Sequence, residues 1–413
     1  MSEGNLLGKK FKELYKAMCQ DEWNPYIVGI LVAFFSVLIL AWMRPWGAVG
    51  AIRNWGDWII YGLGLNPFEM FEDGEAPRHF LKNSGSIIGV GFIAGAFLSA
   101  TLGNQFALRI PPFREFAKAV IAGVLMGVGA ALAGGCNVGG FYNAIGNLSA
   151  SGFAMMLGLV LGAVAGLKAL YWEMEHVSWG SGGSKTIEFP FALQVIFGLL
   201  ALGGILCGAY NYAGSEGDYM AKMGGILLIA AALGYAMQRG RWCMIQGFRE
   251  PHMTGDCTLA KSVALSVLLC AVGIAVIKAA GLQATEHYVR GTFGWGGVVG
   301  GFLFGLGAMF AGGCGTGTLW RVGEGQIKLW LVVPFFGISN SLMTAWFKVT
   351  DVEGKEDWLE EGITNSGKLG EFVYMPDTFL GYGGTLILIT LAMAAWYLVV
   401  KWNEDSNKLI LPM

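Results

Sequence analysis

Charged side chains are scarce in this chain. Only 14% of its 413 residues are Asp, Glu, Lys or Arg, and the formal net charge is −2. A soluble domain usually carries about 25% charged residues, so this composition argues against a soluble globular protein. The lack of a strong positive charge also removes the electrostatic basis for nucleic-acid binding.

Several chemical signatures are missing as well. The chain has 4 histidines and 7 cysteines, with no Cys-x-x-Cys pair and no His-Glu-x-x-His motif, so it predicts neither a zinc site nor a disulfide framework. It has no Walker A loop, which argues against a primary pump, and no pattern typical of a catalytic triad. We therefore expect no catalytic residue, no metal and no cofactor.

Long apolar runs are abundant instead. Hydrophobic residues make up 54% of the chain, and the mean hydropathy is +0.54. Runs of roughly 17–25 apolar residues are typical of transmembrane helices, so the sequence predicts an all-α integral membrane protein with about ten hydrophobic helices. The candidate spans are Tyr26–Met43, Ser84–Gly103, Lys118–Gly135, Ser151–Tyr171, Pro190–Tyr210, Lys222–Gln238, Leu259–Ala280, Gly296–Gly313, Lys328–Phe347 and Leu380–Lys401.

These spans divide the chain into three parts. We expect residues 1–25 to form an amphipathic cytoplasmic segment, residues 26–210 a first transmembrane half and residues 211–413 a second half. One further apolar segment, Trp46–Leu65, holds charged residues among its tryptophans and is predicted to lie at the membrane interface rather than to span the bilayer.

The loop charges predict an orientation. Lys and Arg are concentrated in the loops Arg109–Lys118 and Arg239–Lys261, and the positive-inside rule then places both of these loops in the cytoplasm. With an even number of crossings, both termini are cytoplasmic. We expect a multi-pass protein of the cytoplasmic (inner) membrane.

Two short segments repeat each other 178 residues apart. Ala133–Gly139 reads AGGCNVG and Ala311–Gly317 reads AGGCGTG, and ten of the seventeen positions from Gly123 to Gly139 are identical to those 178 further on. The chain is therefore predicted to contain two pseudo-symmetric, inverted repeats, with short or re-entrant Gly-rich segments before the two cysteines. Internal repeats that meet at a central site are typical of secondary transporters.

The repeated segment places a thiol, Cys136 or Cys314, on a Gly-rich turn. Glycine lets another atom approach the backbone closely, irregular backbone at membrane depth is tolerated where it lines a cavity, and a helix that begins after such a turn favours an anion. A polarizable thiol beside these amides suits an anion with a terminal sulfur or selenium. The alternative is that the glycines only allow close helix packing. The glycines predicted to bind substrate are Gly135, Gly139, Gly313 and Gly317.

A third motif surrounds one cysteine with arginines. Arg241 and Arg249 flank Cys243 at a predicted helix end, where they would hold an anion and favour a thiolate. Ordinary positive-inside flanking explains some of these arginines but not the cysteine. Arg321, after the second Gly-Gly-Cys turn, is predicted as a further anion-attracting residue.

Several motifs together resemble the YeeE/YedE sulfur-transport family, closest to its YedE branch, which is tied to selenium metabolism. The resemblance covers most of the hydrophobic chain. It rests on Leu102–Pro111 (LGNQFALRIP), Gly134–Asn137 (GGCN), Gln238–Cys243 (QRGRWC), Gly247–Arg249 (GFR), Gly312–Cys314 (GGC) and Leu319–Gly325 (LWRVGEG).

The resemblance implies transport of a sulfur- or selenium-containing ion, such as thiosulfate, across the lipid bilayer. It also implies a central path in which Cys136, Cys243 and Cys314 pass the substrate along by transient S–H···S contacts, and a separate TusA-like sulfur carrier protein as a possible partner. The family pattern does not by itself decide between sulfur and selenium, the direction of transport or the oligomeric state.

Two alternatives remain open at this level. The same cysteines could serve a membrane thiol oxidoreductase or sulfurtransferase, which needs one reactive thiol and a resolving partner. A metal site from His252, Asp256 and Cys257 is a weaker alternative to a plain loop.

Glu324 is the best candidate for proton coupling, although an ion pair with Arg321 would explain it equally well.

Overall fold

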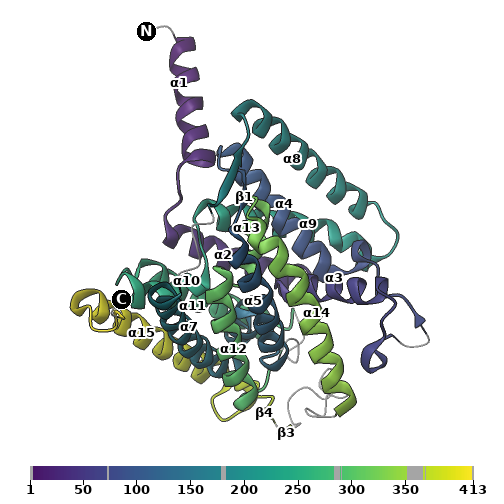
Figure 1. The fold of residues 1–413 in the computed structure, drawn as a ribbon, viewed down its shortest axis with the longest axis vertical. Helices are drawn as coiled ribbons and strands as arrows, with labels where there is room; N and C mark the ends of the chain where they lie inside the picture. The colour runs from purple at the N-terminus through teal and green to yellow at the C-terminus, as the bar shows by residue number, and fades with distance from the viewer. Residues whose placement is uncertain are drawn as a thin grey trace.

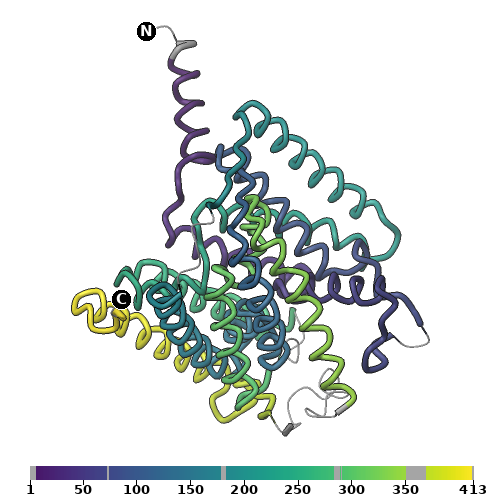
Figure 2. Tube along the Cα trace, in the orientation of Figure 1, coloured from purple at the N-terminus to yellow at the C-terminus, as the bar shows by residue number. Residues whose placement is uncertain are grey.

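The computed structural model describes residues 3–71, 74–177, 183–282, 289, 291–350, 366–367 and 369–411. The described chain is mostly helical, as Figures 1 and 2 show from the purple N-terminal helix to the yellow C-terminal one. The long helices are α2 (Pro25–Trp42), α4 (Ser84–Leu102), α5 (Phe113–Leu132), α7 (Ser151–His176), α8 (Phe191–Ala213), α9 (Asp218–Arg239), α11 (Thr258–Ala279), α12 (Trp295–Ala311), α14 (Ile327–Thr350) and α15 (Gly381–Ser406).

Shorter elements connect them. The short helices and turns are α1 (Glu3–Tyr15), η1 (Lys16–Gln20), α3 (Val49–Gly62), η2 (Pro67–Glu69), η4 (Phe80–Lys82), η5 (Asn137–Tyr142), α6 (Asn143–Gly146), α10 (Met244–Met253), α13 (Gly315–Gly323) and η6 (Met375–Asp377). Two small antiparallel pairs complete the fold: β1 (Ala107–Ile110) with β2 (Lys185–Glu188), and β3 (Ser366–Gly367) with β4 (Gly370–Glu371).

The predicted membrane character is confirmed. Within the described residues, ten helices are long and apolar enough to cross a membrane, and each coincides with one predicted span. Helix ends differ most at α5, which begins at Phe113 rather than Lys118. Lys118 lies inside the helix because Glu115 and Glu173 pair with its ammonium at 2.6 and 3.1 Å.

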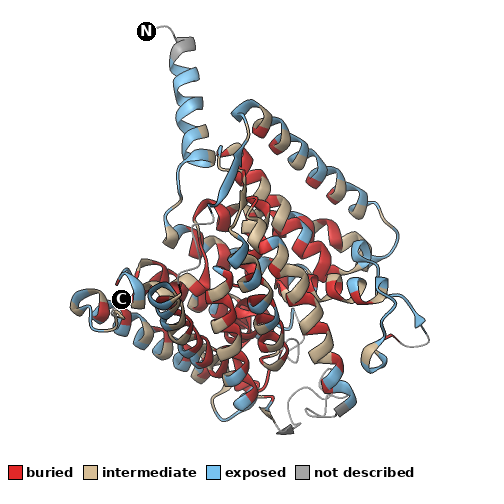
Figure 3. Ribbon diagram, in the orientation of Figure 1, coloured by how far each residue is buried: buried red, intermediate tan, exposed pale blue. Residues whose placement is uncertain are grey.

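Helices in the centre of the molecule pack in matched pairs. α5 packs on α14 as α12 packs on α7, and α4 packs on α9 as α11 packs on α2. Buried residues concentrate in these helices, whereas α1, α8 and α15 stand at the periphery and are largely exposed in Figure 3. The matched pairs support the predicted internal repeat, which stays a prediction.

The segment predicted to lie at the membrane interface packs differently. Within it, α3 inserts against α4 and α14, and Ala51 and Ile52 are fully buried. Gly56 allows this because a Cβ at that position would overlap the backbone of Gly337 on α14. An interfacial helix exposes its apolar face to lipid, whereas α3 buries that face in the protein.

Gly95 fixes the closest approach between α4 and α9. A Cβ there would overlap the carbonyl oxygen of Ala231, and backbone cannot move aside as a side-chain end can. We expect Gly95→Ala to lower the free energy of unfolding by about 1–3 kcal/mol, the usual cost of overpacking, measured as a lower midpoint of thermal unfolding in detergent. Gly203→Ala, on lipid-facing α8 with no atom within 4 Å, should leave the midpoint unchanged or slightly raised.

Candidate functional site

The three predicted cysteines occupy equivalent local positions. Cys136, Cys243 and Cys314 each cap the N-terminus of a short element, respectively η5, α10 and α13. Before two of them the chain reverses through a left-handed glycine, Gly134 at φ 71° and Gly312 at φ 82°, a conformation that only glycine adopts without strain. The Gly-Gly-Cys sequence therefore ends a long helix and starts a short one at a buried thiol.

Two of the thiols are in contact. The Sγ atoms of Cys243 and Cys314 lie 3.5 Å apart, and both side chains are fully buried. The amide of Gly317 donates to the Cys314 Sγ at 3.3 Å, and the hydroxyl of Thr316 lies 3.5 Å from it. This sulfur therefore has an amide and a hydroxyl as well as the second thiol around it.

The third thiol lies on the other side of the first turn of α13. A Cβ at Gly315 would be 3.2 Å from the Cys136 Sγ, and a Cβ at Gly317 would be 2.7 Å from the Cys243 Sγ. Asn137, next to Cys136, accepts a hydrogen bond from the Gly315 amide at 3.2 Å. Cys136 is thus separated from the Cys243–Cys314 pair by a strip of glycine backbone.

The other predicted glycines have distinct surroundings. A Cβ at Gly313 would lie 2.8 Å from Nη1 of Arg321, and one at Gly135 would lie 2.6 Å from the amide nitrogen of Gly140. Gly139 has no atom within 4 Å of such a Cβ and lines a cavity described below. The first two allow close packing, and Gly139 leaves space open.

Arg321 is a cation close to the thiol pair, because its Nη1 would lie 3.8 Å from a Cβ at Gly317. Its guanidinium stacks on Trp320 with 4.6 Å to the ring centroid, and donates to the carbonyl oxygen of Gly312 and to Oε1 of Gln246. Within the described residues, no carboxylate lies within 4.0 Å of it. Its positive charge is therefore available to an anion beside the thiols.

Arg241 and Arg249 differ from Arg321 in having acidic neighbours. Nη1 of Arg241 lies 2.7 Å from Oε1 of Glu324, and Nη2 of Arg249 lies 3.8 Å from Oε1 of Glu250. Glu324 therefore pairs with Arg241. The pairing with Arg321, which the sequence offered as an alternative, does not form. No described contact brings Arg249 to the thiols.

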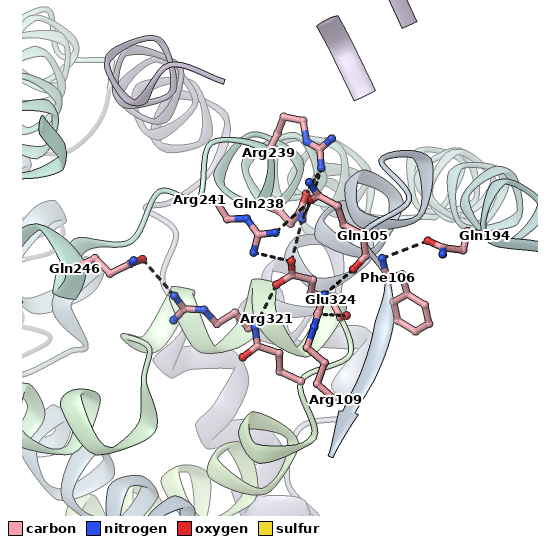
Figure 4. A network of polar contacts seen from close by, with 11 residues as sticks. Gln105, Phe106, Arg109, Gln194, Gln238, Arg239, Arg241, Gln246, Arg321 and Glu324 are labelled. Atoms are coloured by element: carbon pink, nitrogen blue, oxygen red, sulfur yellow. Dashed lines mark hydrogen bonds and ion pairs between the residues drawn. The ribbon is translucent and has the colours of Figure 1, made fainter. Parts of the chain in front are cut away.

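Figure 4 shows the polar network around Glu324. Its carboxylate, which is fully buried, also accepts from Gln238 at 3.5 Å and Gln326 at 3.3 Å. Gln105 accepts from Gln238 at 2.9 Å and from Arg239 at 2.6 Å. Residues from the end of α9, from the turn after α13 and from the segment before β1 are thereby joined.

A cavity opens on the far side of Cys136. It has a volume of about 180 Å³ and is lined by Cys136, Gly135 and Gly139 together with Arg44 and Arg53. The two arginines have no carboxylate within 4.0 Å among the described residues, although Ser84 accepts from Arg44 at 2.8 Å. The sequence analysis did not identify these arginines as site residues.

The cavity and the Arg241 network lie at opposite ends of α2. The amide of Trp23, just before α2, donates to the carbonyl oxygen of Arg239, whereas Arg44 lies two residues after the end of α2. α2 is long and apolar enough to cross a membrane, so the length of this helix separates the cavity from the Arg241 network.

An acidic side chain near the cavity has an altered pKa. Asp57 follows Arg53 by one turn of α3, and burial raises the pKa of its carboxyl group, although a hydrogen bond with Ser341 and the charges of Arg53 and Lys348 act in the opposite direction.

Comparison with known proteins identifies the chain. A sequence model of the family described as sulphur transport matches residues 4–165 and 239–410. The chain belongs to the YeeE/YedE sulfur-transport family. The two matched segments contain all three cysteines and the three predicted arginines.

Individual members of the YeeE/YedE family are similar to the chain over different lengths. The protein named Probable transporter YedE from Escherichia coli K12 is 25% identical over 374 residues, 87% of each chain. The thiosulfate transporter TsuA of the same organism is 31% identical over 183 residues, 44% of this chain and 48% of TsuA. TsuA of Spirochaeta thermophila is 35% identical over 120 residues, 27% of this chain and 33% of that protein.

Membership in the YeeE/YedE family confirms the resemblance predicted from the motifs. It makes the chain a multi-pass membrane transport protein for a sulfur compound rather than an enzyme. The finer assignments, namely the substrate, the cysteine-lined path and the partner, are proposals.

The remaining candidates from the sequence lie outside the site. Nδ1 of His252 is 3.0 Å from the carbonyl oxygen of Leu409, and the Cys257 thiol donates to the carbonyl oxygen of Gly255 at 3.4 Å. Within the described residues, no group of three or more His, Cys, Asp or Glu side chains could hold a metal ion. This loop binds the C-terminal segment of its own chain.

Helix order identifies a position that the sequence analysis missed. Trp46-Gly47 lies between α2 and α3 where Trp242-Cys243 lies between α9 and α10. Both indoles are buried and donate to a serine hydroxyl, Trp46 to Ser36 at 2.7 Å and Trp242 to Ser262 at 2.9 Å. The predicted repeat would therefore place Gly47, which lines the cavity and has no thiol, opposite Cys243.

Proposed function

We propose that this protein conducts a small anion with a terminal sulfur atom, thiosulfate in the first instance, along a path lined by Cys136, Cys314 and Cys243. The observation that carries the proposal is the buried Cys243–Cys314 contact of 3.5 Å beside Arg321, a guanidinium with no acidic partner among the described residues. A cation next to polarizable sulfur atoms is complementary to an anion whose charge is shared with a soft terminal atom.

The chemistry of the thiols suits conduction rather than retention. A thiol is a weak hydrogen-bond donor and acceptor, so each site releases what it binds, as multi-site conduction requires. An oxyanion without a terminal sulfur, such as sulfate, gains less from such contacts because its oxygens prefer strong donors. The path therefore favours a soft anion by contact chemistry rather than by charge alone.

The cavity lined by Arg44 and Arg53 serves as the mouth of the path at the Cys136 end. The anion passes from there to Cys136, and then past the glycine backbone at Gly315 and Gly317 to the Cys243–Cys314 pair. In the described conformation this backbone lies beside all three sulfur atoms, so passage along the proposed path requires the first turn of α13 to shift. The shift displaces no side chains at these two positions, because both residues are glycine.

Orientation and partner complete the proposal. The Arg241 end faces the cytoplasm, together with both termini, because Lys and Arg are concentrated in the loops Arg109–Lys118 and Arg239–Lys261. A separate TusA-like sulfur carrier protein receives the sulfur there. TsuA of Escherichia coli is named for thiosulfate, which supports thiosulfate as the first substrate to test, and a selenium oxyanion is the second because of the sequence resemblance to the YedE branch.

The test is uptake into proteoliposomes containing the purified protein. We expect labelled thiosulfate to enter, sulfate to enter slowly and selenite to report whether selenium is accepted. A sulfurtransferase would instead transfer the outer sulfur to a cysteine and release sulfite, so intact mass analysis of the protein after turnover separates the two functions. Uptake without an added sulfur on the protein supports transport, and a stable persulfide with sulfite release would contradict it.

Removal of the arginines at the cavity should weaken uptake from that side. A hydrogen bond between a charged donor and its acceptor contributes about 1.5–3 kcal/mol, and 1.4 kcal/mol is tenfold in affinity. We expect Arg44→Gln or Arg53→Gln to raise the KM for thiosulfate roughly tenfold or more, with folding intact. Arg78→Gln is the matched control, because Arg78 lies over the Tyr219 ring and does not line the cavity.

A further inference from the structure

Glu324 is a fully buried carboxylate next to a path proposed for anions. It caps the C-terminus of α13, the helix that begins at Cys314. Its only ionic partner among the described residues is Arg241, at 2.7 Å. Because Arg241 neutralises this carboxylate, a substrate anion that reaches Arg241 competes with Glu324 for the same guanidinium.

Arg241 is placed to meet the substrate. Its side chain is 36% exposed, and its guanidinium lies 5.7 Å from the centre of the Trp320 ring, the ring on which Arg321 stacks at 4.6 Å. Two guanidinium groups therefore share one indole, with Arg321 on the side of the thiol pair. Arg241 holds a left-handed φ of 50°, a conformation that costs a residue with a side chain about 1–2 kcal/mol, so the turn is set to direct this side chain.

We infer that the Glu324 carboxylate pairs with Arg241 while no substrate is bound there. A substrate anion that moves between the thiol pair and the exposed end of Arg241 displaces this carboxylate. This inference rests on the proposed function and names Glu324 as the residue that keeps Arg241 from retaining the substrate. No bond is made or broken, and the step is an exchange of one anionic partner of Arg241 for another.

The surrounding residues keep both Glu324 and Arg241 hydrogen-bonded during the exchange. When Arg241 turns to the substrate, Glu324 still accepts from Gln238 and Gln326, at 3.5 and 3.3 Å. Arg241 can keep its contact of 3.4 Å with Oε1 of Gln105. Figure 4 shows Gln238 and Arg241 directed toward Glu324, with Gln105 beside them.

The exchange has a measurable consequence for affinity. The apparent dissociation constant of a ligand rises in proportion as the binding-competent state becomes rarer. If Glu324 leaves Arg241 free about one tenth of the time, its removal tightens anion binding about tenfold and slows release by a similar factor. Glu324 therefore lowers the affinity of the protein for the anion and speeds the release of the anion.

The test compares Glu324→Gln, Arg241→Gln and the double variant in proteoliposomes. We expect Glu324→Gln to lower both the KM for thiosulfate and the maximal uptake rate, each by several-fold to about tenfold. Arg241→Gln should raise the KM, and the double variant should show no tightening, because the tightening requires the free guanidinium. Gln326→Leu is the control for the loss of a neutral partner of Glu324 and should not lower the KM.

The outcomes are distinguishable from failure of the proposed function. If the wild-type protein takes up thiosulfate but folded Glu324→Gln keeps its KM or raises it, the exchange is wrong and transport stands. If the double variant still binds more tightly, the effect does not pass through Arg241 and the exchange is wrong. If the wild-type protein takes up no thiosulfate, the proposed function fails and the exchange fails with it. Should Glu324→Gln not fold, Glu324→Asp, which retracts the charge by one methylene, must show the same decrease in KM.

Discussion

Replacement of Cys243 or Cys314 by serine should reduce thiosulfate uptake by about ten- to hundredfold. The variant replaces a polarizable sulfur at the 3.5 Å contact with a hydroxyl oxygen, which holds a soft anion less well. A loss of about 1.4–2.8 kcal/mol in the substrate contact corresponds to ten- to hundredfold. The measurement is the initial rate of uptake into proteoliposomes with equal amounts of folded protein.

Other cysteines of the chain provide the controls. Cys270→Ser places a hydroxyl at a position in α11 that is equally buried but outside the site, and Cys207→Ser changes an exposed position on α8. Loss of uptake in Cys270→Ser to the same extent would show that burial of the hydroxyl, and not loss of the thiol path, causes the defect. Uptake that survives in both Cys243→Ser and Cys314→Ser would contradict the cysteine-lined path.

A single methyl group at Gly317 should have an effect of similar size. Its Cβ would lie 2.7 Å from the Cys243 Sγ and 3.2 Å from the Cys314 Sγ, so Gly317→Ala fills the space between the two thiols. We expect uptake to fall by tenfold or more, on the basis of about 1–3 kcal/mol for overpacking. Stability should change less, since alanine favours a helix over glycine by about 1 kcal/mol.

The repeated segment contains the matched control for this variant. Gly139 is 178 residues before Gly317, and a Cβ there meets no atom within 4 Å. Gly139→Ala should therefore retain most of the uptake. Equal loss in both variants would indicate that these glycines are needed for backbone flexibility, whereas loss in Gly317→Ala alone locates the tight point of the path at the thiol pair.

Much of the architecture could be predicted from the sequence because membrane helices leave a strong signal. The number of apolar spans, their approximate bounds and the family all follow from hydropathy and from a few Gly-Cys and Arg-Cys motifs. The position of α3 could not be predicted, because Trp46–Leu65 has the charges of an interfacial helix and only contact with α14 shows that its apolar face is inside the protein.

The candidate site was predicted in part. The motifs identified the cysteines, but the contact between Cys243 and Cys314 joins residues far apart in the chain, and no periodicity reports such a distance. Arg44 and Arg53 were missed because they stand in a segment without a cysteine. For Glu324 the sequence offered proton coupling or an ion pair with Arg321, whereas the turn after α13 directs the carboxylate to Arg241, a residue 83 positions earlier in the chain.

Gly47 has a consequence for the kinetics of the two faces. In the predicted repeat Gly47 takes the position of Cys243, so along the proposed path two thiols lie toward the Arg241 end and one toward the Arg44 end. We then expect the free energy of an anion along this path to be asymmetric, with its minimum nearer the Arg241 end. Net flux is still zero when the substrate activity is equal on both sides. The substrate concentration that gives half-saturation, however, differs between the two faces. Counterflow measured from each side of a vesicle with uniformly oriented protein should therefore give two different half-saturation constants.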